Sequence, residues 1–309
     1  MEGRDTQLHM SPVLIWRALP AFLIGCTATG DAGLDLFADG FVPLEVVGED
    51  FAFTGDGRLV TVDAMSGVVE LTRDGDAGIV APYSSDEVAG LALLPGGGLV
   101  FCDEALGALV QIGEDGAQTV LASGLNNPNS VAVAADQTLY FTAFDALLRL
   151  APESAVVETV LVAPGADLDG LTFDPGFRSL WFNHDETGQV HRVDVSAFSG
   201  TELQSERVAS IDTDYGGELD GMTTDVDGNV YVVQVDGVVR RINAAGGLEL
   251  IADLDIPGIF TSAIRFGSGS GGWPRDHLFV LDRDGSGVHE IDIGIDGAPL
   301  PHLQPPNPS

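Results

Sequence analysis

The sequence contains no lysine, and each of its 13 basic residues is an arginine. This absence excludes catalysis through a lysine Schiff base. Against the 13 arginines stand 47 acidic residues, which give a formal net charge of −34 at pH 7. Because nucleic-acid phosphates need basic partners, this charge argues against a nucleic-acid-binding protein. It favours cation binding or a strongly solvated, exported surface.

Cysteine is nearly absent too, since the 309 residues contain only Cys26 and Cys102. Two cysteines exclude a disulfide framework and a thiolate metal cluster, and we expect Cys102 to be a buried, inert strand residue. Cys26 follows the short apolar stretch 18–24, as in a bacterial lipobox, where a signal peptide is cleaved before a cysteine that then carries lipid. The stretch is too short to span a bilayer as a helix. We expect a leader over residues 1–30, export to the periplasm or cell surface, and a membrane contact only through lipid on Cys26; an ordinary disordered leader is the alternative.

After the predicted leader the sequence shows no helical periodicity. Instead a three-residue motif, called the phrase below, recurs six times. Its six copies begin at Glu49, Ala89, Asn129, Asp169, Asp220 and Thr261. The starting positions differ by 40, 40, 40, 51 and 41 residues. Such a period marks a repeat architecture.

Each repeat is predicted to contain short β-strands separated by turns. After every phrase comes a first strand, then a turn, then a run rich in β-branched and aromatic residues, such as 99–102 and 230–233. A fourth strand is present in five repeats and missing from the sixth, and residues 34–38 ahead of the first phrase can supply it. Closing a ring in this way removes the exposed edge of an open array. We predict an all-β, six-bladed β-propeller, with residues 31–309 as one domain.

The repeated phrase also predicts a site, because the first strand of each propeller blade lines the central channel. Equivalent residues then form a ring, which contains Glu49, Asn129, Asp169 and Asp220. Three carboxylates and one amide are hard oxygen ligands, suited to Ca²⁺ or Mg²⁺. Without a cation such carboxylates repel one another, so at least one should be protonated. Asp-Gly is also a common turn dipeptide, but the shared phase of these residues favours a metal site.

Four segments that contain the ring residues resemble the signature segments of a known family. They are Gly48-Glu49, Asn127-Pro128-Asn129-Ser130, Asp169-Gly170-Leu171 and the run 220–229. The resemblance is to the SMP-30/gluconolactonase/luciferin-regenerating-enzyme (LRE) family, which is structurally related to diisopropylfluorophosphatase, and it extends over residues 34–293. It implies a divalent ion, commonly calcium, held by Glu49, Asn129, Asp169 and Asp220. It also implies that Asp220 acts as general base or nucleophile.

The chain departs from the family pattern at three places. Asp169 stands where the family usually has asparagine, and the extra negative charge should tighten cation binding. Asp50 stands where the family usually has glycine. Asn126 and Asn127 stand where some sugar lactonases have an arginine just before the position of Asn129. The sequence therefore does not indicate an aldonolactone as the substrate.

Together these features predict a metal-dependent hydrolase of lactones or related esters that acts on a small molecule. The cation (Ca²⁺, or another divalent ion such as Mg²⁺, Mn²⁺ or Zn²⁺) polarises the carbonyl, and water attacks while Asp220 takes its proton. Asn127, Thr261 and Trp181 are candidate substrate contacts.

Two other functions are compatible with the same fold, since a propeller does not determine function. One is a non-catalytic propeller of the NHL type that binds a protein or glycan, with calcium as a structural ion. The other is a lyase or synthase. Four histidines in or beside the second and third strands are expected to be satisfied strand residues away from the ring; they are His184, His191, His277 and His289.

Overall fold

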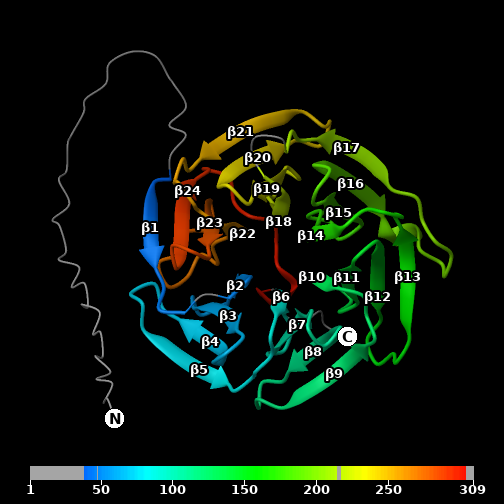
Figure 1. Ribbon diagram of the computed structural model, residues 1–309, viewed down its shortest axis with the longest axis horizontal. Coiled ribbons are helices and arrows are strands. Elements are labelled where there is room, and N and C mark those ends of the chain that lie inside the picture. Colours follow the sequence, from blue (N-terminus) through cyan, green and yellow to red (C-terminus); the bar gives the residue numbers. More distant parts are fainter. Residues whose placement is uncertain (1–37, 47, 214–216, 304–309) are drawn as a thin grey trace, which may run out of the picture. The chain divides into compact units, whose positions relative to one another are not determined.

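The computed structural model describes residues 38–46, 48–213 and 217–303 of the chain. These residues belong to one compact unit, Asp35–Ser309, and form six antiparallel sheets of four strands each around a central channel (Figure 1). The predicted six-bladed β-propeller is therefore confirmed, and each sheet is called a blade below. Residues 1–30, predicted to be a leader with Cys26, lie outside the described residues. In the described ranges, no helix has the length and apolarity needed to cross a membrane.

Each blade runs from an inner strand beside the channel to an outer strand at the rim. The inner strands are β2 (Phe51–Phe53), β6 (Val88–Leu93), β10 (Pro128–Val133), β14 (Leu168–Phe173), β18 (Leu219–Thr224) and β22 (Thr261–Phe266). The second strands are β3 (Leu59–Asp63), β7 (Leu99–Asp103), β11 (Leu139–Ala143), β15 (Ser179–His184), β19 (Val230–Gln234) and β23 (His277–Asp282). The third strands are β4 (Gly67–Leu71), β8 (Ala108–Ile112), β12 (Ala146–Leu150), β16 (Gln189–Asp194), β20 (Val238–Ile242) and β24 (Gly287–Asp292). The outer strands are β5 (Ala77–Ala81), β9 (Gln118–Ser123), β13 (Val157–Val162), β17 (Glu206–Ser210), β21 (Leu248–Asp253) and β1 (Gly40–Pro43).

The hydrophobic core lies between neighbouring blades. In one cluster, Trp181 and Val190 of one blade pack against Met222 and Val232 of the next. Second strands are the most buried, because both of their faces contact a neighbouring blade, and this explains their nearly continuous apolar sequence. Cys102 in β7 is a free, fully buried thiol, as expected.

An N-terminal strand closes the ring, as predicted, but it lies further along the chain than residues 34–38. The closing strand β1 pairs with β24, with Gly40 opposite Glu290 and Pro43 opposite Gly287. Ala38 is not in a strand, and residues 34–37 lie outside the described part. The alternation of side chains along the strand explains why β1 lies here, because in this register Val42 faces the core and is 7% exposed.

The repeated phrase coincides with an irregularity of the inner strands. In five blades the pairing with the second strand shifts there, between Val88/Leu91, Pro128/Val131, Leu168/Leu171, Leu219/Met222 and Thr261/Ala263. A Cβ on Gly170 would lie 2.3 Å from the Asp220 carbonyl oxygen of the next inner strand, and one on Gly90 would lie 2.7 Å from that of Asn129. Glycine is therefore needed at these two positions because adjacent inner strands approach each other closely there, and not because the phrase forms a turn.

Candidate functional site

A cavity of about 240 Å³ lies at the end of the channel where the inner strands begin. Glu49, Asn129, Asp169 and Asp220 all line it, together with Ala89. The structure thus brings together the four residues predicted as metal ligands, although they are spread over 171 positions of the chain.

Side chains of the second strands hold the backbone of the ring residues. The Thr142 hydroxyl donates to the Asp169 carbonyl oxygen at 3.2 Å. The Asn183 amide donates to the Asp220 carbonyl oxygen at 2.5 Å and accepts from the Gly170 N–H at 3.1 Å. These bonds satisfy groups that the strand irregularity removes from the sheet ladder, and they fix the direction in which the carboxylates leave the backbone.

Glu49 differs from the other ring residues because it has a cationic partner. Its carboxylate contacts the guanidinium of Arg283, which also lies over the Phe260 ring at 5.0 Å from the ring centre. The Ser262 hydroxyl donates to the Glu49 carbonyl oxygen at 2.6 Å. Burial raises the pKa of Glu49 to about 7, although the charge of Arg283 opposes this shift.

Five further carboxylates line the same cavity, and none of them belongs to the repeated phrase. They are Glu87, Asp167 and Glu218, two residues before the phrase, and Glu104 and Asp185, directly after second strands. Burial, helped by the charges of Glu87 and Glu49, raises the pKa of Glu104 to about 7. Burial and the charge of Glu218 raise the pKa of Asp185 to about 7. For Glu87, Asp167 and Glu218 the sequence did contain a signal, because each lies two residues before a copy of the phrase.

The two ring aspartates face the strongest electrostatic cost. Burial, and then the charge of Asp185, raises the pKa of Asp169 well above its usual value. For Asp220 the causes are burial and then the charge of Asp169. A divalent cation would relieve this repulsion, and the donor set of carboxylates with the Asn129 amide fits a hard ion of the Ca²⁺ type. Among the described residues, the ring does not bring three carboxylate ligand atoms within 4.8 Å of one another.

Of the three candidate substrate contacts, only Asn127 lines the cavity. Thr261 is fully buried, and its hydroxyl donates to the Gln234 carbonyl oxygen at 2.6 Å. Trp181 is 2% exposed and packs between two blades, because it lies on a second strand and its side chain faces the neighbouring blade. The aromatic side chain that does line the cavity is Phe260, which is 36% exposed.

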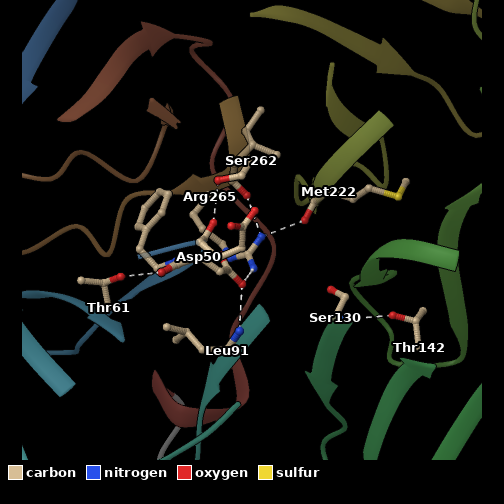
Figure 2. A network of polar contacts seen from close by, with 11 residues as sticks. Asp50, Thr61, Leu91, Ser130, Thr142, Met222, Ser262 and Arg265 are labelled. Atoms are coloured by element: carbon tan, nitrogen blue, oxygen red, sulfur yellow. Dashed lines mark hydrogen bonds and ion pairs between the residues drawn. The ribbon is translucent and has the colours of Figure 1, made fainter. Parts of the chain in front are cut away.

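Asp50, next to Glu49, forms a separate buried network inside the channel (Figure 2). Its carboxylate accepts hydrogen bonds from the Leu91 N–H at 3.0 Å and the Phe51 N–H at 2.7 Å, and it pairs with the Arg265 guanidinium at 2.5 Å. Arg265 also donates to the Met222 carbonyl oxygen at 3.2 Å. The residue that replaces the usual glycine therefore ties three inner strands together.

Comparisons with known proteins agree with this architecture. The model of the family described as SMP-30/gluconolactonase/LRE-like region matches residues 50–281. A search of the curated proteins gave no significant match. Among solved structures, a calcium-binding protein, regucalcin, from Agrobacterium tumefaciens has a TM-score of 0.65 at 17% identity, with 84% of this chain and 95% of that chain covered. A gluconolactonase from Xanthomonas campestris has a TM-score of 0.62 at 18% identity, covering 84% and 98%. A virginiamycin B lyase from Staphylococcus aureus has a TM-score of 0.60 at 16% identity, covering 78% and 79%. Identities this low show the shared fold alone.

Proposed function

Because the chain belongs to the SMP-30/gluconolactonase/LRE-like family, we propose that it is a divalent-metal-dependent hydrolase of lactones or related esters. The observation that carries this proposal is the convergence of Glu49, Asn129, Asp169 and Asp220 on one cavity. Burying unpaired carboxylates costs free energy. A propeller that serves only as a scaffold has no need to gather them.

In this proposal Glu49, Asn129, Asp169 and Asp220 hold the ion, which would supply the positive charge that polarises a lactone carbonyl. Asp220 takes the proton of the attacking water. Its backbone is fixed by the hydrogen bond from Asn183.

The charge of the cavity narrows the class of substrate. Eight carboxylates and a single guanidinium, that of Arg283, are among the side chains that line it. Such a cavity repels anions, so neutral or cationic lactones and esters are the expected substrates. Asn127 and Phe260 are the polar and the apolar contact that they would meet. Export with a lipid on Cys26 remains part of the proposal.

The test is a panel of neutral, cationic and anionic lactones and esters, assayed before and after removal of metal with EDTA. We expect hydrolysis that EDTA abolishes and Ca²⁺ restores. Mass spectrometry of the product shows whether one water has been added, which separates a hydrolase from a lyase. If EDTA lowers only the melting temperature and no substrate is turned over, the protein is a metal-stabilised binding scaffold and the proposal is wrong.

A further inference from the structure

The blade that β1 closes carries a histidine surrounded by carboxylates, outside the channel cavity. His277 begins β23 and lies directly opposite Asp292 of β24 in the pairing register. Because side chains alternate across a strand, Glu290 and Asp292 share one face of β24. Asp276 precedes His277 in the chain. Asp276, His277 and Asp292 are the one place among the described residues where three such ligand atoms lie within 4.8 Å of one another.

His277 is held in a defined orientation through one of its ring nitrogens. Its Nδ1 atom lies 2.9 Å from Oε1 of Glu290, and the other carboxylate oxygen of Glu290 pairs with Arg73 of the neighbouring blade. The Glu290 side chain is only 12% exposed. A carboxylate on Nδ1 favours the tautomer with its proton there, which leaves the lone pair on Nε2.

The Nε2 atom then faces two oxygens that are also acceptors. It lies 3.9 Å from Oδ1 of Asp276 and 3.7 Å from Oδ1 of Asp292. Both distances exceed the range of a hydrogen bond. They are close to the spacing of about 3.4 Å between neighbouring ligand atoms around a tetrahedral zinc ion with bonds of 2.0–2.2 Å.

We propose that Asp276, His277 and Asp292 bind a divalent transition-metal ion of the Zn²⁺ type. Imidazole nitrogen suits such an ion, whereas Ca²⁺ prefers oxygen donors, so the two metal sites of the chain differ in chemistry. Glu290 is the outer carboxylate that orients His277. The Asp292 side chain is 58% exposed, so solvent water reaches the site and completes the coordination.

The position of this site links metal binding to closure of the propeller. Asp39, directly before β1, donates from its backbone N–H to the Glu290 carbonyl oxygen at 2.7 Å. The Asp39 carboxylate accepts from the Asp292 N–H at 2.6 Å. An ion shared by β23 and β24 therefore stabilises the two strands against which β1 is seated, and the closed ring gains stability from every bound ion.

The test is a titration of the full-length protein with Zn²⁺ alone, after metal removal with EDTA and in excess Ca²⁺ to saturate the channel ring. We expect one zinc ion per chain and a higher melting temperature. His277→Ala and Asp292→Asn should each weaken zinc binding at least tenfold. Glu290→Gln should weaken it about tenfold or more, the usual cost of losing an outer carboxylate.

The matched control is Asp284→Asn, which removes the same charge from an exposed position at the other end of the same blade and should leave zinc affinity unchanged. Co²⁺ supplies a second readout, because its visible absorption should depend on the imidazole of His277 and disappear in His277→Ala. The proposal is overturned if no zinc binds in excess Ca²⁺. It is also overturned if His277→Ala binds zinc like the wild type, or if Asp284→Asn loses binding equally.

Discussion

The two ends of the central channel are built from the same inner strands, yet their chemistry is opposite. Where the inner strands begin, eight carboxylates line the cavity. Where they finish, a cavity of about 260 Å³ is lined largely by apolar side chains, among them Phe53, Phe173 and Phe266. The C-terminal segment 296–303 covers that end, with the Ala298 N–H bonded to the Thr224 carbonyl oxygen at 2.8 Å.

This contrast shows that the propeller fold sets positions but not polarity. In five of the six blades the inner strand has one irregular position near this end, and the residues at that phase decide whether the end becomes acidic. The opposite end is covered by the C-terminal segment 296–303, which does not belong to any of the six repeats. Between the two ends, Asp50 pairs with Arg265, which also lines the cavity of the apolar end. We therefore expect substitutions at the acidic end to affect function. Substitutions at the Asp50–Arg265 pair and at the apolar end should affect stability.

The largest expected effect is on catalysis at the acidic end. Asp220→Asn removes the proposed general base and should lower kcat by about 10²- to 10⁴-fold without unfolding the protein. The measurement is turnover of the best lactone, with circular dichroism as a check of the fold. Asp227→Asn, an exposed aspartate of the same blade, is the matched control. Wild-type turnover by Asp220→Asn would show that the acidic end performs no acid–base step at this residue.

The second effect concerns the level between the two ends. Arg265→Met leaves the Asp50 carboxylate, which is 7% exposed, without its cation. Breaking a buried pair in this way should lower the free energy of unfolding by about 3–5 kcal/mol. Adding Asp50→Asn to the same chain should recover most of the loss, and urea denaturation of the three proteins measures it. No recovery in the double variant would mean that Arg265 acts through packing and not through its charge.

The third effect separates the apolar end from the site. A chain that stops at Ile295 lacks the covering segment, including the bond from His302 to the Phe53 carbonyl oxygen at 2.9 Å. We expect a loss of about 2 kcal/mol in the free energy of unfolding, with kcat of the folded protein unchanged. Thermal melts and lactone kinetics on the same samples give both quantities. A fall in kcat would show that the two ends are coupled.

The fourth effect is a pH dependence of the metal-free protein. Burial raises the pKa of Glu49 and Glu104 from 4.5 to about 7, so their contribution to stability is fully present below pH 4.5 and is lost as the pH rises through 7. The melting temperature of EDTA-treated protein should therefore fall over this window. Ca²⁺ should restore it, most strongly above pH 7. A metal-free melting temperature that rises over the same window contradicts the raised pKa values.

The smallest expected effect is a change of affinity. Asp169→Asn restores the residue that is usual in the family and removes one of the ring's negative charges. The dissociation constant for Ca²⁺ should therefore rise about tenfold, which corresponds to ~1.4 kcal/mol of binding free energy. Isothermal titration calorimetry measures this difference. Asp174→Asn, just beyond the same inner strand, serves as the comparison. Unchanged affinity in Asp169→Asn would show that the negative charge of Asp169 does not contribute to cation affinity.

Much of the fold could be predicted from the sequence, because strand phase repeats along the chain. The period of the phrase predicted the inner strands and brought Glu49, Asn129, Asp169 and Asp220 to one cavity. The closing strand was predicted at residues 34–38, an apolar run that comes just before β1. Only the pairing of β1 with β24 distinguishes the two runs.

The rest of the site depended on contacts that no local pattern records. Glu104 and Asp185 come from turns after second strands, where the repeat is less regular. Trp181 was predicted to be a substrate contact from its residue type, whereas its place on a second strand directs its side chain toward the next blade. The Asp50–Arg265 pair joins residues 215 positions apart, and its geometry depends on the packing of whole blades.

The shared last blade also has a consequence for synthesis. Among the described strands β1 is translated first, whereas β22, β23 and β24 of the same sheet are translated last. Arg283, the guanidinium beside Glu49, likewise emerges more than 200 residues after its partner. The eight carboxylates of the cavity all lie at or before Asp220, so they are translated before Arg283 and before the strands that close the ring. A chain that stops before β22 would lack Arg283 and the sheet that β1 completes, so it could not close the ring around these carboxylates.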